Sequence, residues 1–263
     1  DTLLYALNII RNYTMHPDEM IRRRSYRLTS DIGFRSKSSE VKSLVLEILI
    51  DATLDSKISI RESVSRTFSL FSKDLYTQDF KNKLKNIMRI DNAITSTHAL
   101  LVGFLDMSEF EDQLLRISQD TSNYSNNIKS GKSYFKSIGF SAHLAMARMG
   151  RKESIDFAIA SFEKSDLWSL VVRYLYLVAY IKQREAVDLL VQLLKTEEEI
   201  GGGDVILETY GSRTLNYLIP MFEEFPVKGC KPICIYNNKQ VEIARQIMNG
   251  DGKLNLKINK DVW

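Results

Sequence analysis

One short run of this chain resembles part of a phosphate-binding loop. Ser130-Gly131-Lys132-Ser133 carries the Gly-Lys-Ser ending with which such loops hold the phosphates of a nucleotide. The full motif also needs a glycine five residues before the Gly-Lys pair, where this chain has Asn126, and a strand before the loop. We therefore expect a solvated loop here, with a phosphate site as the alternative.

The histidines and cysteines offer few combinations for catalysis or metal binding. His16, His98 and His143 lie far apart, and none belongs to the His-Glu-x-x-His pattern of zinc enzymes. A packed or hydrogen-bonded role is expected for His143, with a ligand or acid–base role as the alternative. Cys230 and Cys234 lack the further ligands of a zinc site, so we expect thiols, with a disulfide as the alternative.

The remaining candidate nucleophiles and acids form no catalytic pattern. The chain has no Gly-x-Ser-x-Gly sequence, and neither cysteine has a recognisable nucleophile signature around it. Carboxylates are plentiful, but carboxylates on helices normally face solvent. The sequence therefore nominates no catalytic residue, and we expect no cofactor and no metal.

Charge is distributed unevenly, although the net charge of the chain is only +3. Residues 20–42 have a local balance of +5, and residues 185–225 have a balance of −7. Two solvated faces would explain this pattern. The alternatives are a binding site for an anionic partner near Arg22, Arg23 and Arg24, and an end-to-end contact between copies of the chain.

The spacing of apolar residues predicts helices almost everywhere, as in Val41, Leu44, Val45 and Ile48. Only 4 of the 263 residues are proline, which suits long helices, and no uninterrupted apolar run reaches 18 residues, so no transmembrane segment is expected. The apolar stretch 168–181 is expected to be a buried helix. A short β-like run, 231–236, is expected to be a connector.

Local signals suggest where several helices begin and end. Pro17 fits the first position of a helix, and Ser59 with Glu62 fits a capping box. Gly33 and Gly150 fall where helices would stop.

Internal repeats organise these helices. An offset of 32 superposes Ile155 on Val187 and Ala147 on Ala179, and an offset of 39 superposes Ile21 on Ile60. A small residue marks each first helix and would let the partner helix approach closely. These markers are Ser30, Ser69, Gly103, Ala147 and Ala179. The longest spacing, 44 residues, contains a polar insert at 119–133.

The repeat pattern resembles that of the HEAT-repeat family. The family pattern consists of a first helix, a short turn and a second helix. Ile60-Arg61 with Phe68 follows the first half of this pattern, and Glu185-Ala186-Val187 follows the second half. Residues 142–155 follow the whole pattern. The resemblance covers residues 17–224, although a sixth first helix at 204–210 is short. It implies an all-α superhelix of about six antiparallel helix pairs, with a concave face that holds a partner.

We therefore expect a single α-solenoid domain over residues 1–263. Residues 1–16 would form an N-terminal cap helix, and residues 225–263 a C-terminal cap and tail with a helix at 238–248. The chain opens at Asp1 within a helical pattern, which is compatible with removal of a signal peptide or an upstream region. The compartment stays open between the cytoplasm and export.

Four short polar side chains recur at one position of the second helices. In the proposed register Asp112, Asp156, Asp188 and Asn216 each follow the first buried position of a second helix. Because second helices line the concave side in HEAT-like folds, these residues would form a stripe for an extended peptide or a cationic segment. The alternative is that they stabilise helix N-termini.

The leading hypothesis for function is a non-enzymatic scaffold that binds an unknown protein or peptide on its concave face. The second hypothesis is a nucleic-acid-binding protein such as an alkylpurine DNA glycosylase, because some of these enzymes resemble this chain in fold. Those enzymes place Trp and Asp around the lesion, and here Asp166, Trp168 and Arg173 lie close together in sequence. Tyr176 and Tyr180 lie one turn apart and would share a face. Together with Trp168 and Tyr174 they are expected to pack in the core, with a surface for a partner or for base stacking as the alternative. The small net charge and the acidic repeats argue against nucleic acid.

Overall fold

The computed structural model describes the whole chain except residues 1, 91–92, 125–133, 201–207, 230–234 and 250–255. The described chain is mostly helical, which confirms the predicted all-α class. Its strands are β1 (Glu199–Ile200) and β2 (Glu208–Thr209), which pair antiparallel, with Glu199 opposite Thr209. No described helix is long and apolar enough to cross a membrane.

The chain divides into two compact units. Unit 1 comprises residues 1–105 and 261–263, and unit 2 comprises residues 106–260. The helices of unit 1 are α1 (Thr2–Tyr13), α2 (Glu19–Arg35), α3 (Ser39–Ala52), α4 (Ile58–Phe68), α5 (Gln78–Met88) and α6 (Ser96–Phe104), with a 3-10 turn η1 (Lys73–Leu75).

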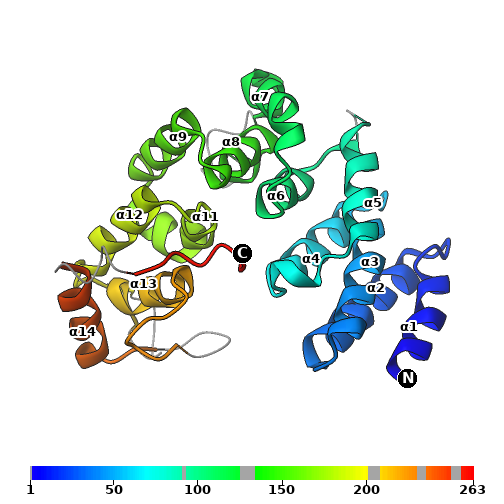
Figure 1. Cartoon of the computed structure of the whole chain (residues 1–263), viewed down its shortest axis with the longest axis horizontal. Coiled ribbons are helices and arrows are strands. Elements are labelled where there is room, and N and C mark those ends of the chain that lie inside the picture. The colour runs from blue at the N-terminus through cyan, green and yellow to red at the C-terminus, as the bar shows by residue number, and fades with distance from the viewer. Residues whose placement is uncertain (1, 91–92, 125–133, 201–207, 230–234, 250–255) are drawn as a thin grey trace. The chain divides into compact units, whose positions relative to one another are not determined.

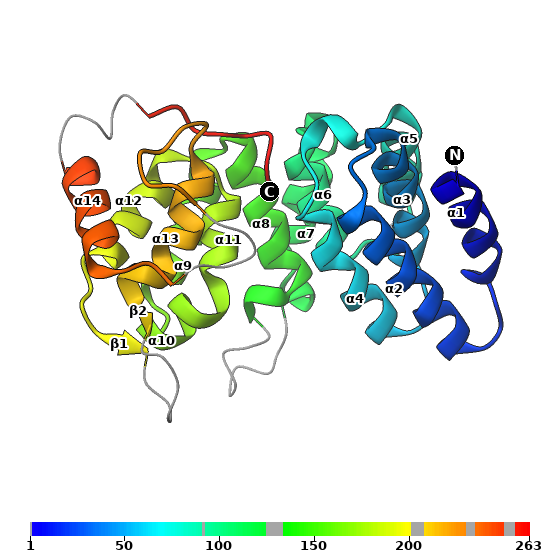
Figure 2. The same cartoon turned by 90° about the horizontal axis from the view of Figure 1, so that it is seen from below.

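Unit 1 arranges its helices in two layers (Figures 1 and 2). Helix α3 packs against α1 and α5 in one layer, and α2 packs against α4 in the other. Buried apolar side chains fill the space between the layers, among them Leu7, Val45, Leu49 and Phe68. Tyr76, in the turn after η1, packs edge-on against Phe80 and donates its hydroxyl to the Phe68 carbonyl oxygen at 2.7 Å.

Unit 2 has the same layered construction. Its elements are η3 (Ser108–Phe110), α7 (Glu111–Gln119), η4 (Thr121–Asn123), η6 (Tyr134–Lys136), α8 (Ile138–Met149), α9 (Lys152–Glu163), α10 (Leu167–Ser169), a π-helix η7 (Leu170–Tyr174), α11 (Leu175–Tyr180), α12 (Arg184–Leu194), α13 (Tyr210–Leu218), η8 (Ile219–Met221) and α14 (Asn238–Asn249). Helix α11 packs against α8 and α13, and α12 packs against α9 and α14.

The predicted helix ends are right in some places and wrong in others. Gly150 ends α8 in the left-handed conformation, with φ of 101°, as expected of a C-terminal glycine. Gly33 is not a stop, because it lies inside α2, where a Cβ would approach Val45 Cγ1 to 2.7 Å. Its lack of a side chain lets α2 approach α3.

Two predicted helix starts are also displaced. Asp18, rather than Pro17, precedes α2, and its carboxylate accepts from the Met20 amide at 2.7 Å. Ser59 forms no capping box, because α4 already begins at Ile58. A capping box occurs instead at the start of α6, where Thr95 and His98 satisfy each other's backbone amides.

The predicted small residues are buried in unit 2 but not throughout. Ala147 and Ala179 are buried on α8 and α11, which pack together, as the offset of 32 requires. Ser69 is exposed at the end of α4, so the close contact predicted for it is wrong; Thr67 contacts Ser30 instead, with their hydroxyls 3.2 Å apart. Residues 168–181 are helical as expected, but a π-helical turn interrupts them.

Candidate functional site

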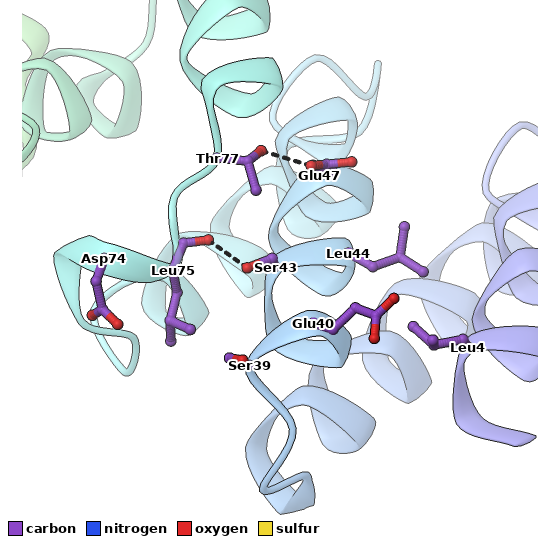
Figure 3. Close-up of a pocket in the computed structure, with 9 residues that line it drawn as sticks. All are labelled: Leu4, Ser39, Glu40, Ser43, Leu44, Glu47, Asp74, Leu75 and Thr77. Atoms are coloured by element: carbon purple, nitrogen blue, oxygen red, sulfur yellow. Dashed lines mark hydrogen bonds between the residues drawn. The ribbon is translucent and has the colours of Figure 1, made fainter. Parts of the chain in front are cut away.

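A groove of about 620 Å³ runs along the outward face of α3 (Figure 3). Residues 40, 43, 44 and 47 of α3 are spaced so that they share one side of the helix. Figure 3 shows Glu40 and Leu44 facing Leu4 of α1 on one side, while Ser43 and Glu47 approach the segment from Asp74 to Thr77 on the other. The groove is therefore bounded by α1 and by the turn before α5. Its lining residues are Leu4, Ser39, Glu40, Ser43, Leu44, Glu47, Asp74, Leu75 and Thr77.

Hydrogen bonds fix one wall of this groove and leave its acids available. Ser43 Oγ donates to the Leu75 carbonyl oxygen at 2.8 Å, and Thr77 Oγ1 donates to Glu47 Oε1 at 2.6 Å. Glu40 and Asp74 have no hydrogen bond or ion pair with any residue that the structure describes. The groove thus offers carboxylates beside leucine side chains, which suits a segment with both cationic and apolar side chains. Sequence patterns could not find it, because its walls come from three separate elements.

The three consecutive arginines Arg22, Arg23 and Arg24 have different environments. Arg22 is held by Asp55 through two hydrogen bonds of 2.7 and 3.1 Å, and it also donates to the His16 carbonyl oxygen. The hydrogen bond to Arg22 lowers the pKa of Asp55. Arg23 and Arg24 are exposed and have no partner among the described residues. Of the three, only Arg23 and Arg24 are therefore free to bind an anionic partner.

The four residues of the predicted polar stripe lie at different positions within their helices, and they do not all share one layer. Asp112 lies in the first turn of α7, whereas Asp156 and Asp188 lie at the fifth positions of α9 and α12. Asn216 lies on α13, which packs against α11 in one layer, whereas α14 packs against α12 in the other layer. In the proposed repeat, α11 is a first helix and α12 is a second helix. Asn216 therefore does not share the layer of the other three stripe residues.

Asp156 and Asp188 lie on neighbouring helices, and a lysine links these helices. Lys152 Nζ lies 2.9 Å from Asp156 Oδ1 and 2.9 Å from Glu185 Oε1, so it joins α9 to α12. The Asp156 and Glu185 side chains raise the pKa of Lys152. Asp156 is exposed, and Asp188 is partly exposed. Because only Asp112 lies in a first turn, stabilisation of helix N-termini does not explain all four residues.

The residues around Trp168 form a compact surface cluster. The guanidinium of Arg173 lies 4.6 Å from the centre of the Trp168 ring. Trp168 itself is 42% exposed. Asp166 accepts from the Ser169 amide at 2.8 Å, and this bond lowers the pKa of Asp166. Tyr176 is exposed and Tyr180 is buried, so the predicted shared aromatic face is wrong.

The described histidines have structural roles. His98 is buried, accepts from the Thr95 amide at Nδ1, and lies 2.6 Å from Thr53 Oγ1 through Nε2. Burial lowers the pKa of His98 to about 4. His143 stacks on Phe157 and lies 3.3 Å from Ser154 Oγ, and burial lowers its pKa to about 4 as well.

Two buried cations lie near each other in unit 2. Arg148 donates to the Tyr180 and Lys260 carbonyl oxygens at 2.6 and 2.9 Å. Lys182 Nζ donates to the Pro220 carbonyl oxygen at 3.1 Å. Burial, together with the charge of Arg148, lowers the pKa of Lys182 to about 7. Both cations hold backbone oxygens.

Several candidates from the sequence lie outside the described residues. These are Ser130-Gly131-Lys132-Ser133 and the pair Cys230 and Cys234. Within the described part of the chain, no group of three His, Cys, Asp or Glu residues is close enough to hold a metal ion. No protein-family model, curated protein or solved structure matches the chain.

Proposed function

We propose that this chain is a non-enzymatic protein-interaction scaffold with a HEAT-like architecture of about six antiparallel helix pairs. The packing of α8 with α11, and of α9 with α12, supports the repeat register inferred at an offset of 32. Stacked helix pairs bury their shared faces and leave long rows of side chains on the outward faces. Such rows suit the binding of extended protein segments.

The observation that carries this proposal is the amount of uncovered apolar surface in unit 1. Among the described residues, 16 large apolar side chains are exposed, and 12 of these belong to unit 1. The 12 are Leu3, Tyr5, Ile9, Tyr13, Met15, Met20, Leu28, Phe34, Leu54, Ile58, Leu70 and Ile90. Seven of them lie on α1 and α2, and exposed apolar side chains that gather on neighbouring elements are typical of protein-binding faces.

The groove on α3 gives this surface a place to hold a partner segment. Leu4, Leu44 and Leu75 would cover apolar side chains, and the carboxylates of Glu40 and Asp74 would accept from cationic ones. A protein segment bound there is the expected ligand.

Site-specific photo-crosslinking tests the proposal. A photoreactive phenylalanine analogue placed at Leu44 or Tyr5 should crosslink to one and the same protein in an extract of the source cells. The same analogue at Gln192, an exposed position of α12, serves as the control. The scaffold proposal fails if Leu44 and Tyr5 yield no protein that is absent from the Gln192 control.

The cluster around Trp168 favours a second candidate, a DNA-binding function related to base excision. An exposed tryptophan with an arginine stacked on it can contact an unstacked base and a phosphate together. Binding to a DNA duplex that contains an alkylated base would then weaken steeply with salt. Equal binding by wild type and the Trp168→Ala variant would reject this candidate.

A further inference from the structure

Helix α2 presents a continuous exposed face on the layer that it shares with α4. Eight exposed residues fall within roughly 140° of the helix circumference at 100° per residue. We call this surface the α2 arginine face. Its residues are Met20, Arg23, Arg24, Arg27, Leu28, Asp31, Phe34 and Arg35.

The four arginines of this face are unpaired. Arg23, Arg24, Arg27 and Arg35 have no hydrogen bond or ion pair with any described residue. Arg22 on the same helix, in contrast, is bound by Asp55. With Asp31 included, the face therefore carries a net charge of +3, and its arginines form no ion pair with any described side chain.

The arrangement is unfavourable for the helix alone. Arg23 and Arg27 are four residues apart, a spacing at which like charges repel on a helix. A bound anionic partner would relieve this repulsion.

Large apolar side chains lie among these arginines. Phe34 is 65% exposed, and Met20 and Leu28 are each at least half exposed. Aromatic side chains, methionine and arginine are the types enriched in the buried parts of protein interfaces. The face thus combines apolar anchors with cations along about 21 Å, the rise over the 14 helical steps from Met20 to Phe34.

The combination selects one class of partner. A nucleic acid would neutralise the arginines but would leave Phe34 and Leu28 uncovered by its phosphates. An anionic bilayer would approach Asp31, which lies near the middle of the face. A protein segment that carries both acidic and apolar side chains on one face can pair with the arginines and cover the apolar side chains together. A cation of the segment can also pair with Asp31.

We infer that the α2 arginine face binds an acidic amphipathic helical segment of a partner protein. This inference rests on the proposed scaffold function and names the chemistry of one partner. The carboxylates of the segment pair with Arg24 and Arg27, and its apolar side chains cover Phe34. Asp31 fixes the direction and register of the segment, because it repels an acid placed opposite it.

Fluorescence anisotropy with a synthetic peptide tests the inference. The probe is a labelled 18-residue peptide of alanine, glutamate and leucine, with leucines at i, i+4, i+7 and i+11 and glutamates flanking them. The Arg24→Glu/Arg27→Glu variant should bind it at least tenfold more weakly than wild type at 50 mM salt. A peptide with glutamine in place of every glutamate should lose at least tenfold, and Phe34→Ala should weaken binding about three- to tenfold.

Matched variants separate this face from a general charge effect. Lys195→Glu/Lys239→Glu changes the net charge equally at exposed, unpaired positions of unit 2 and should bind like wild type. Ile90→Ala removes an exposed apolar side chain elsewhere in unit 1 and should also bind like wild type. Circular dichroism and the melting temperature verify that each variant is folded.

Three results would overturn the inference. One is equal binding by wild type and the Arg24→Glu/Arg27→Glu variant. Another is binding of vesicles with 30% phosphatidylserine, or of a 20-base-pair DNA duplex, as tightly as the peptide and with the same loss in that variant. The third is no peptide binding while crosslinks at Leu44 and Tyr5 persist, in which case the scaffold proposal stands and the acidic partner of α2 does not.

Discussion

Arg148 of α8 donates a hydrogen bond to the carbonyl oxygen of Tyr180, and its guanidinium lies 4.9 Å from the centre of the Tyr180 ring. The two residues are 32 positions apart, which is the offset inferred between the repeats. Helix α8 is therefore tied to the end of α11 by a contact between two positions that are equivalent in the proposed repeat. The same arginine also bonds the Lys260 carbonyl oxygen.

Replacement of Arg148 by alanine should lower the free energy of unfolding by about 2–4 kcal/mol, because the buried Tyr180 carbonyl oxygen and the Lys260 carbonyl oxygen both lose their donor. Urea denaturation monitored by circular dichroism measures the effect. Arg116→Ala, at an exposed position of α7, should change stability by less than about 0.5 kcal/mol. Equal effects of the two substitutions would mean that Arg148 does not hold unit 2 together.

Stability should rise with pH between about 7 and 9 because of Lys182. Its pKa is about 7 in the folded chain and 10.5 in the unfolded chain, so the unfolded state binds more protons across this window. Urea denaturation at several pH values should show the slope in wild type and a reduced slope in Lys182→Met. An unchanged slope in Lys182→Met would show that this lysine is not buried as the structure indicates; Lys195→Met, at an exposed position, is the control.

Acid should destabilise unit 1 through His98. The pKa of this histidine is about 4 in the folded chain and 6.5 in the unfolded chain, so its contribution is complete above pH 6.5 and is lost as pH falls towards 4. The full loss is on the order of 3 kcal/mol. His98→Gln should weaken the pH dependence, and His143→Gln serves as a comparison because its pKa is also lowered but its side chain is partly exposed. A dependence that persists in both variants would require another titrating group.

Enlargement of the small residues between the repeats should be destabilising. Ala147→Leu and Ala179→Leu each insert three carbons into a packed contact, and the expected cost is about 1–3 kcal/mol. Thermal denaturation measures it, with Ala160→Leu at a partly exposed position of α9 as the control. A melting temperature unchanged by Ala179→Leu would contradict the proposed register.

Neutralising the predicted stripe separates its two interpretations. Asp156→Asn removes an exposed pair with Lys152, so its effect on stability should stay below about 0.5 kcal/mol. Asp156→Asn and Asp188→Asn together should weaken crosslinking of a partner if the stripe contributes to binding. Full retention of that crosslinking would leave these residues with only a local role on their helices.

The positions of most helices, one helix end and two buried small residues could be predicted from the sequence. The apolar period gave the helices, and Gly150 was identified as a helix end because glycine readily adopts the left-handed conformation. Ala147 and Ala179 were identified because a fixed offset relates them. Gly33 was misread, since a glycine inside a helix and a glycine after a helix look the same without knowledge of Val45 across the interface.

The candidate site depended on contacts that the sequence does not encode locally. The groove unites Leu4, Glu40 and Asp74 from three elements, and no spacing rule links them. Likewise, Arg22 and Arg23 are adjacent in sequence, yet only Arg22 meets Asp55, 33 residues further along the chain. The sign of the charge near α2 was therefore predictable, but the division between structural and available arginines was not.

In the part of the chain that the structure describes, a left-handed residue follows a helix three times. It is Asp106 after α6, Gly150 after α8 and Lys182 after α11, with φ values of 58°, 101° and 51°. Three chemically unlike side chains thus occupy one backbone conformation, for which only glycine has no steric cost. The helices on either side therefore specify the turn, and the identity of the left-handed residue does not predict it. Glycine placed at Asp106 would lower the strain of that junction, whereas glycine at Lys182 would also remove the hydrogen bond to the Pro220 carbonyl oxygen.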